Sequence, residues 1–343
     1  MKIAVMTNPG ELEFQERVIP SFGDTEVLVR IKAVGLCTWE QKFYKGIAGS
    51  YPFLGGHEIS GIVEGVGENV AQNLKKGDQV VVASLTRCGE CHYCRRGLDN
   101  LCENTGSDSN PDSDGLWGPG GFSEYFLARG YEVYKISDNA ALETGTLAEP
   151  LACVLRSIDR SRLEVGDTAL ILGGGVMGLL HLLLAKQRGT NVIVSEPDIS
   201  RREKALKLGA DLVVDPINED LKKLVEEYTE GRGAETVFFT AGGKNAINGG
   251  LECLVPNGTM IIYGGTGAED QITLDPKIFH YNEIYLTGVT KHTKDTFRRA
   301  AELISSGILP LEELISEQYP FEKIAEGFDR AGAMDTFRVI VTM

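Results

Sequence analysis

Four cysteines that lie close together in the sequence could hold a metal ion. They follow the pattern Cys-x-x-Cys-x-x-Cys with a fourth cysteine further on, and they are Cys88, Cys91, Cys94 and Cys102. Four thiolates at such short spacing can close a tetrahedral shell, which is typical of a structural zinc site. An iron–sulfur cluster is the alternative, but the ferredoxin run has its fourth cysteine nearer and followed by proline, whereas Glu103 follows Cys102 here.

A glycine-rich turn could bind the phosphates of a dinucleotide. The segment Gly173–Gly178 matches G-x-G-x-x-G, with a short apolar run before it and a helical pattern after it. In this motif Gly173 makes the tight turn, Gly175 lets the backbone approach the pyrophosphate, and Gly178 packs the helix against the strand. The phosphates then lie at a helix N-terminus, which favours anions. A glycine turn without a ligand is the alternative, but the flanking elements favour a dinucleotide site.

An acid after the next β-rich run indicates which dinucleotide is bound. Glu196 is placed to accept hydrogen bonds from a ribose 2′-OH. A carboxylate there repels a 2′-phosphate, which favours NAD over NADP. Arg201 and Arg202 follow closely and weaken this preference, because arginine can hold a 2′-phosphate.

Other residues could form a second, catalytic zinc site, which takes three protein ligands and leaves one position open. The candidates are Cys37, His57, Glu58 and Glu149. Taken singly they have ordinary alternatives. Cys37 could be a small core residue, His57 a hydrogen-bonded histidine at a strand start, and Glu149 a side chain that reaches solvent at a helix break.

The elements that must position these residues fall into two kinds. Residues 1–85 consist of short β-branched runs separated by glycine, proline and asparagine, which predicts a β-rich barrel or sandwich. Residues 155–290 alternate between strand and helix patterns, which predicts a doubly wound parallel sheet with a ligand crevice at its carboxyl edge. A last strand, 337–342, could return to the β-rich part. A chain of 343 residues is also long enough for about two domains.

Composition narrows the classes of partner. The net charge is −15, which argues against a nucleic-acid partner because phosphate binding needs a basic surface. No apolar run has membrane-spanning length, and the first residues lack a signal-peptide pattern. Seven cysteines, an odd number, argue against a disulfide framework. We expect a cytoplasmic protein with neither a nucleic-acid nor a membrane partner.

Together these motifs resemble those of the zinc-dependent medium-chain dehydrogenases, and most closely their polyol branch, the sorbitol dehydrogenase-like proteins. The resemblance covers essentially the whole chain. It implies a GroES-like catalytic domain, 1–153 with 291–343, and an NAD-binding Rossmann domain, 154–290. It also implies a homodimer or homotetramer. The matching motifs are Gly35-Leu36-Cys37, Gly56-His57-Glu58, the four-cysteine segment, Glu149-Pro150, Gly173–Gly178 and Glu196.

The resemblance also assigns roles. It implies a catalytic zinc held by Cys37, His57 and either Glu58 or Glu149, with both carboxylates near the metal. Many alcohol dehydrogenases similar to this chain have a second cysteine at the position of Glu149. Met177 matches a position that packs on the cofactor, and Arg201 matches one beside the adenosine ribose.

One residue departs from the family pattern. The family usually reads Cys-x-Ser/Thr-Asp, and the hydroxyl relays the substrate proton, whereas this chain has Trp39 at that place. An indole N–H only donates, so it cannot accept and pass on a proton. We expect the proton to leave through Glu58, Glu149 or a water chain, with Trp39 forming a pocket wall. Lys42 stands where threonine dehydrogenases usually have a histidine, which disfavours threonine as substrate.

The expected activity is hydride transfer from a secondary alcohol of a polyol, cyclitol or sugar to NAD, with one catalytic and one structural zinc per chain. An amino-alcohol dehydrogenase and a simple or aromatic alcohol dehydrogenase are the enzymatic alternatives. A zinc-free quinone reductase is disfavoured because those proteins lack the cysteine segment. A non-catalytic nucleotide-binding protein is the alternative from another class.

Overall fold

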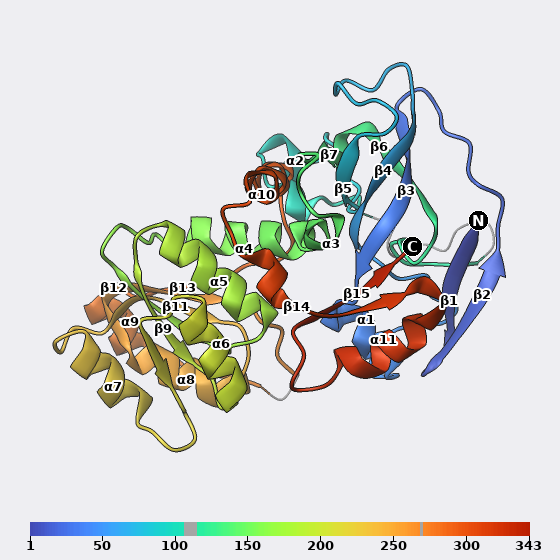
Figure 1. The fold of residues 1–343 in the computed structure, drawn as a ribbon. Coiled ribbons are helices and arrows are strands. Elements are labelled where there is room, and N and C mark those ends of the chain that lie inside the picture. The colour runs from blue at the N-terminus through green and yellow to red at the C-terminus, as the bar shows by residue number, and fades with distance from the viewer. Residues whose placement is uncertain (106–114, 268–269) are drawn as a thin grey trace. The chain divides into compact units, whose positions relative to one another are not determined.

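The computed structural model describes residues 1–105, 115–267 and 270–343. The chain divides into two compact units, whose elements are labelled in Figure 1. One unit comprises Met1–Ala152 and His292–Met343, and the other comprises Cys153–Lys291. Every candidate zinc ligand therefore belongs to the first unit, and the glycine turn belongs to the second.

A seven-stranded sheet forms the centre of the first unit. Six strands follow the order β14-β15-β3-β4-β5-β7, and β6 also pairs with β3. The first half of β3 pairs antiparallel with β6, and its last residues pair with β15 near the C-terminus, which Figure 1 draws in red beside the blue β3. The strands are β3 (Glu26–Gly35), β4 (Glu58–Val66), β5 (Gln79–Ala83), β6 (Tyr125–Arg129), β7 (Val133–Lys135), β14 (Ile315–Pro320) and β15 (Arg338–Thr342).

The core of this unit lies against the β-branched side chains of the sheet. Val27, Val29 and Ile31 alternate along β3 and are buried, as a strand with one core-facing side requires. Phe53, Phe122 and Phe328 complete the same cluster. A separate hairpin joins β1 (Lys2–Asn8) to β2 (Glu11–Glu16).

Helices of the first unit contain or directly follow several of the candidate ligands. Pro150 lies in the first turn of α4, where backbone N–H groups have no helical acceptor, so the proline does not interrupt the helix as its position in the sequence suggested. The helices are α1 (Thr38–Tyr44), α2 (His92–Arg95), α3 (Leu142–Gly145), α4 (Ala148–Arg160, which ends in the second unit), α10 (Lys294–Ser306) and α11 (Ile324–Ala331).

The second unit contains a six-stranded parallel sheet in the order β10-β9-β8-β11-β12-β13. The chain builds outward from β8 through β9 to β10, and then returns to add β11, β12 and β13 on the other side. The strand order thus reverses between β8 and β11, which is where such sheets bind ligands. The strands are β8 (Thr168–Leu172), β9 (Asn191–Ser195), β10 (Leu212–Val214), β11 (Ala234–Phe239), β12 (Leu254–Ile262) and β13 (Tyr285–Gly288).

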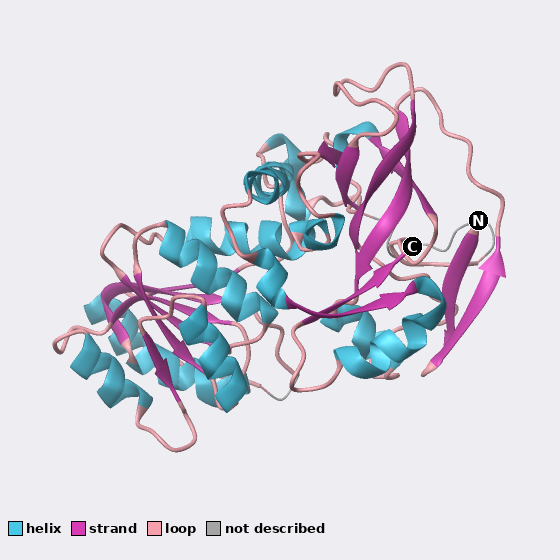
Figure 2. Cartoon of the chain, viewed as in Figure 1, coloured by secondary structure: helices cyan, strands magenta, loops and turns pink. Residues whose placement is uncertain are grey.

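Helices flank this sheet on both faces, as Figure 2 shows. Residues Gly178 to Ala185 of α5 are all buried, because this helix packs against β8 and β9. The helices of this unit are α5 (Val176–Gln187), α6 (Ile199–Lys207), α7 (Leu221–Tyr228), α8 (Gly243–Glu252) and α9 (Pro276–Asn282).

The structure confirms the predicted fold class, a β-rich domain combined with a doubly wound parallel sheet. Seven of the helices and strands given above were not predicted, namely β2, α1, α2, β7, α9, β14 and α11. In β2 and β14 polar residues dominate, so the strand pattern is weak in the sequence. No helix in the described part of the chain is long and apolar enough to cross a membrane.

Candidate functional site

The four cysteines of the predicted structural zinc site converge in the first unit. Their Sγ atoms all lie within 4.8 Å of one another, and none of the four forms a disulfide. The Sγ of Cys88 is 4.0 Å from that of Cys94 and 3.6 Å from that of Cys102. A tetrahedral shell with Zn–S bonds of about 2.3 Å has S···S distances of about 3.8 Å, so the cluster fits zinc.

Backbone N–H groups donate hydrogen bonds to these sulfurs, which favours the thiolate form that binds a cation. The N–H of Cys91 donates to the Sγ of Cys88 at 3.3 Å, and the N–H of Cys94 donates to the Sγ of Cys91 at 3.4 Å. Backbone donors from Glu90 and Cys91 lower the pKa of Cys88 to about 6. Burial raises the pKa of Cys94 to about 12, a cost that a bound cation would remove.

The predicted catalytic ligands also converge. His57, Glu58 and Glu149 offer ligand atoms within 4.8 Å of one another, and so do Cys37, Glu40 and His57. Cys37 lies between β3 and α1, His57 and Glu58 lie at the start of β4, and Glu149 lies in the first turn of α4. Three segments therefore supply two groups of possible ligands that share His57; Cys37 belongs to one group, and Glu58 and Glu149 belong to the other.

Glu58 is a fully buried carboxylate that forms an ion pair with Arg338. Its Oε1 lies 2.9 Å from Nη2 of Arg338, yet neither oxygen makes a well-aligned hydrogen bond within the described residues. Burial raises the pKa of Glu58 to about 7, although Arg338 and His57 oppose the shift. Arg338 also donates to the carbonyl of Leu36 at 3.0 Å, which ties Glu58 to the segment that precedes Cys37.

Glu40 orients His57. One oxygen of the buried Glu40 carboxylate accepts from the backbone N–H of Gly56 at 3.0 Å and lies 2.6 Å from Nδ1 of His57. A carboxylate at this place holds the proton on Nδ1 and leaves Nε2 as the metal ligand. Against the effect of burial, Glu40 and Cys37 raise the pKa of His57 well above its usual value.

Gly35 and Gly56 make room for this arrangement. A Cβ on Gly35 would lie 2.0 Å from an oxygen of Glu58. Gly56 has a φ of +94°, and a Cβ there would lie 2.6 Å from the backbone of Gly121. Glycine is therefore required at both positions, next to two candidate ligands.

The donor set fits a catalytic zinc ion. A thiol, an imidazole and carboxylates are the ligands that zinc takes in proteins. Both Glu58 oxygens and Oε2 of Glu40 lack hydrogen-bond partners among the described residues, as expected for carboxylates arranged around a cation. Burial raises the pKa of the Cys37 thiol, which is also a cost that a bound metal would offset.

Trp39 lies beside this cluster, in the first turn of α1. Its ring centroid is 5.7 Å from that of His57, and its edge contacts hold it against Phe43 at 4.7 Å and Phe53 at 5.5 Å. It remains 39% exposed. An aromatic surface thus stands next to the candidate metal ligands where a hydroxyl was expected from the family pattern.

The glycine turn of the second unit has the geometry that its motif predicts. Gly173 has a φ of +106°, and a Cβ on Gly178 would lie 1.9 Å from the carbonyl oxygen of Gly173. Gly175 precedes α5, and a Cβ built there would have, apart from its chain neighbours, only Nη1 of Arg201 within 4 Å among the described residues, at 3.7 Å. The backbone at Gly175 is thus open to a ligand, next to Met177 in the first turn of α5.

Glu196 is buried at the end of β9 and faces the same turn. Its Oε2 accepts from the N–H of Gly174 at 2.6 Å, and its Oε1 accepts from the N–H of Asp198 at 2.9 Å. The carboxylate is thus fixed beside the glycine turn, where the sequence placed a ribose-binding acid.

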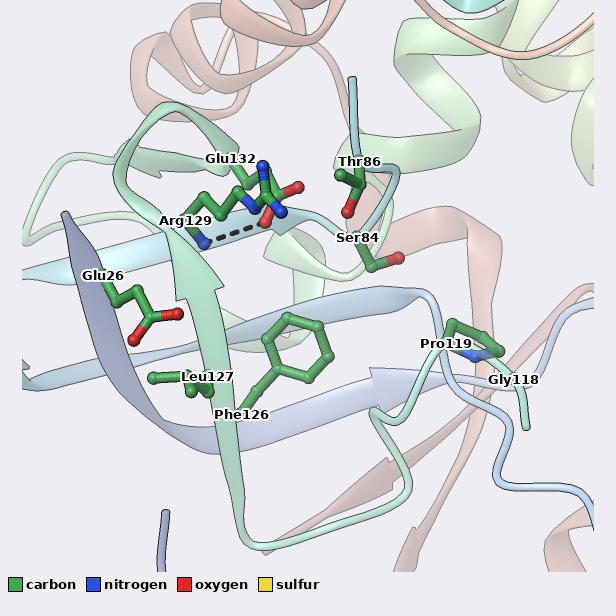
Figure 3. A pocket seen from close by; sticks show the side chains of 9 residues that line it. All are labelled: Glu26, Ser84, Thr86, Gly118, Pro119, Phe126, Leu127, Arg129 and Glu132. Carbon is green, nitrogen blue, oxygen red and sulfur yellow. Dashed lines mark hydrogen bonds between the residues drawn. The ribbon is translucent and has the colours of Figure 1, made fainter. Parts of the chain in front are cut away.

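A hollow of about 250 Å³ in the first unit contains none of these candidate residues (Figure 3). Arg129 and Glu132 lie at one end of it, where the N–H of Arg129 donates to Glu132 at 2.9 Å. One lining residue, Ser84, donates from its hydroxyl to the backbone carbonyl of His57 at 3.5 Å. Its lining consists of Glu26, Ser84, Thr86, Gly118, Pro119, Phe126, Leu127, Arg129 and Glu132.

Sequence reasoning missed Glu40 and Arg338. Glu40 occupies the acidic position of the Cys-x-Ser/Thr-Asp pattern, so that motif is the signal that could have identified it. Arg338 has no such signal, because it reaches Glu58 only through the pairing of β15 with β3.

Two family models match the chain. The model described as "Alcohol dehydrogenase GroES-like domain" matches residues 23–138, and that described as "Zinc-binding dehydrogenase" matches residues 176–306. The first region lies within the first unit, and most of the second region lies within the second unit.

Individual relatives match over nearly the full length. The chain is 31% identical to sorbitol dehydrogenase of Bacillus subtilis, over 96% of this chain and 93% of the relative. It is 32% identical to L-threonine 3-dehydrogenase of Pyrococcus horikoshii, over 98% of this chain and 97% of the relative. A crystal structure from Sinorhizobium meliloti 1021, described as that of a zinc-binding dehydrogenase bound to NADP, is similar with a TM-score of 0.89 and 28% identity, covering 100% of this chain and 99% of that one.

Proposed function

The chain belongs to the zinc-dependent medium-chain dehydrogenases, and from this premise we propose that it oxidises a secondary alcohol of a polyol, cyclitol or sugar with NAD. It is an oxidoreductase of CH–OH donors that uses zinc and a nicotinamide dinucleotide. The observation that carries the proposal is that two groups of possible ligands share His57: one contains Cys37, and the other contains Glu58 and Glu149.

Cys37, His57 and one or both of the carboxylates Glu58 and Glu149 would hold the catalytic zinc, and Cys88, Cys91, Cys94 and Cys102 would hold the structural zinc. When bound, the catalytic zinc supplies Lewis acidity and NAD supplies a hydride acceptor. An oxygen ligand in place of a second thiolate makes the site more polar, which suits a substrate that carries several hydroxyl groups.

The chain's own residues fix the geometry in which this chemistry occurs. Glu40 holds the ring of His57 and Arg338 holds the carboxylate of Glu58, so neither ligand has to reorganise during turnover. In the second unit, Gly175 would leave space for the pyrophosphate, Met177 would pack on the cofactor and Glu196 would accept hydrogen bonds from the ribose. Arg201 would lie beside that ribose.

The substrate proton needs a route that does not involve Trp39. Where Glu149 holds the zinc, the buried carboxylate of Glu58 beside it can take up and release the proton. Glu149 and a chain of water molecules are the other routes. Trp39 forms a wall on which the apolar face of the substrate packs.

An amino alcohol is the second candidate substrate. The 32% identity with a threonine 3-dehydrogenase over 98% of this chain favours it. Lys42, which stands where those enzymes usually have a histidine, argues against it. We therefore place polyols, cyclitols and sugars first.

We also propose a homodimer or homotetramer in the cytoplasm. Strand β13 is at the edge of its sheet, and Tyr281 and Tyr285 beside this edge are 78% and 47% exposed. An open strand edge with aromatic neighbours favours pairing with a second copy. Unpaired cysteines that ligate zinc favour a reducing compartment.

A substrate screen tests the proposal. Purified protein with a known zinc content is assayed for NADH and NADPH formation with polyols, inositols, sugars, L-threonine and benzyl alcohol. We expect NADH formation with at least one compound of the first three groups. Faster turnover of threonine than of any polyol, cyclitol or sugar would favour the second candidate, and no turnover with two zinc ions bound would contradict both.

A further inference from the structure

Arg202 makes hydrogen bonds to backbone carbonyls and an ion pair with Asp215. It lies on α6, directly after Arg201, and Nη1 of its guanidinium donates to the backbone carbonyls of Glu196 and Pro197, at 2.7 Å each. Its Nη2 lies 3.3 Å from Oδ2 of Asp215, in an ion pair whose two side chains are each only 16% exposed. One side chain thus connects the turn after β9 to the turn after β10.

The turn held in this way carries Glu196, the candidate ribose ligand. The N–H of Glu196 donates to the carbonyl of Val214 at 3.0 Å, so the backbone of this residue is held from the β10 side as well. Its carboxylate accepts from Gly174 and Asp198. The position of the Glu196 backbone therefore determines whether its carboxylate can accept the hydrogen bond from Gly174 in the glycine turn.

Asp215 is a rigid partner for Arg202. One of its oxygens accepts from the N–H of Ile217 at 3.0 Å, and the other accepts from the side-chain amide of Asn218 at 3.0 Å. These hydrogen bonds lower the pKa of Asp215, so it is ionised at neutral pH, where Arg202 is also charged. The ion pair consequently joins two ordered turns.

The two neighbouring arginines differ in what their guanidinium groups contact. The Nη1 of Arg201 would lie 3.7 Å from a Cβ on Gly175, next to the turn where the phosphates are expected. The donors of Arg202 are instead engaged by the backbone of the turn and by Asp215. Arg202 therefore has little capacity left to receive a ribose 2′-phosphate.

We propose that Arg202 is a positioning residue of the dinucleotide site, which holds the Glu196 turn in place through Asp215 and does not itself contact the cofactor. The inference rests on the proposed function, because it assumes that Glu196 accepts the adenosine ribose. An arginine at this place in the sequence otherwise indicates a residue that binds the 2′-phosphate of NADP. The inference instead assigns Arg202 to holding the Glu196 turn.

The test is calorimetric titration of the full-length zinc-loaded protein with NAD, ADP-ribose and NADP, which requires no turnover. The variants are Arg202→Met, Arg202→Lys and Asp215→Asn. Arg188→Met is the matched control, because Arg188 also pairs with an aspartate of the same unit, Asp159 at 2.7 Å, but lies away from the Glu196 turn.

We expect Arg202→Met to raise the Kd of NAD and of ADP-ribose about tenfold, as for the loss of charge-assisted hydrogen bonds that hold a ligand-binding group. The same substitution should not weaken the binding of NADP more than it weakens the binding of NAD. Arg202→Lys should restore part of the affinity, Asp215→Asn should weaken NAD binding by about threefold, and Arg188→Met should leave it unchanged. The KM for NAD should rise more than kcat falls.

Other outcomes would overturn the inference. A Kd of NAD in Arg202→Met within about twofold of the wild-type value, with only a lower thermal midpoint, would mean that the contacts stabilise the fold alone. A selective loss of NADP binding would make Arg202 a phosphate receptor. If Arg202→Met does not fold, Asp215→Asn decides by the same criteria. Absence of NAD binding by the wild-type protein would instead contradict the proposed function.

Discussion

The side chain of Glu40 shows how much the candidate zinc site depends on residues that are not themselves proposed ligands. Its carboxylate reaches the Nδ1 of His57 and the N–H of Gly56 at the same oxygen. The hydrogen bond fixes both the rotation of the imidazole ring and the nitrogen that carries the proton. His57 in turn is the residue that the two groups of candidate ligand atoms share.

Glu40→Gln should weaken the catalytic zinc site. A glutamine keeps the size of the side chain but removes the charge that supports His57, and partners of this kind change metal affinity by about 10- to 100-fold. The measurement is zinc competition with a chelator. Zinc at the four cysteines should be unaffected, and Glu64→Gln, which removes a carboxylate paired with Lys76 in the same unit, is the control. Equal zinc affinity in Glu40→Gln and wild type would contradict this role.

Trp39→Ser should change substrate preference more than it abolishes turnover. The substitution removes the aromatic wall beside His57 and restores the hydroxyl that the family pattern has at this place. The measurement is kcat/KM over a panel of alcohols of different size, together with the zinc content. If turnover were lost with every alcohol while both zinc ions remained bound, the assignment of Trp39 as a wall would be wrong.

Residues of the site could be predicted where a short motif contains them. Cys37, His57 and Glu58 belong to such motifs, as do the four clustered cysteines. Arg338 could not be predicted, since nothing near it in the sequence indicates a partner at Glu58. That contact exists only because β15 pairs with β3, and a pairing between opposite ends of the chain has no local signal.

At the scale of elements, the parallel sheet was the easiest part to predict and the connections were the hardest. The bounds of β9 and β10 follow directly from their β-branched runs, and the glycines mark the turn between β8 and α5. The element α9 was missed because Pro276 at its start reads as a loop residue, although proline is favoured in the first turn of a helix.

Helix α5 contains a buried histidine that makes the second unit sensitive to acid. The Nδ1 of His181 lies 2.7 Å from the carbonyl of Met177, and its Nε2 lies 2.8 Å from the hydroxyl of Ser157. The side chain is fully buried, between the rings of Phe238 and Tyr263. Burial lowers the pKa of His181 from 6.5 to about 4.

The second unit should lose stability between pH 6.5 and pH 4. The pKa of His181 is lower in the folded than in the unfolded chain, so the unfolded chain binds the extra proton and stability falls as the pH falls. At pH 5 the loss relative to pH 7.5 should be about 2 kcal/mol. The measurement is urea unfolding of wild type and His181→Gln at both pH values. An equal change in the two proteins would exclude His181 as its cause.

At the scale of the whole molecule, the candidate residues for zinc and those for the dinucleotide lie in different units. The first unit contains both sets of candidate zinc ligands, and the second contains the glycine turn with Glu196 and Arg201. The division into a β-rich and a doubly wound part could be predicted, because strand patterns change their spacing along the chain. The identity of the alcohol could not, because Trp39, the residue proposed to form the pocket wall, departs from the family pattern.

The most direct test is a zinc count combined with anomalous scattering at the zinc edge. We predict two zinc ions per chain, one at Cys88, Cys91, Cys94 and Cys102 and one within reach of Cys37, His57 and a carboxylate. Cys37→Ser should lose the second ion and keep the first. A wild-type protein that binds zinc only at the four clustered cysteines, or a Cys37→Ser variant that keeps both ions in place, would contradict the catalytic zinc site.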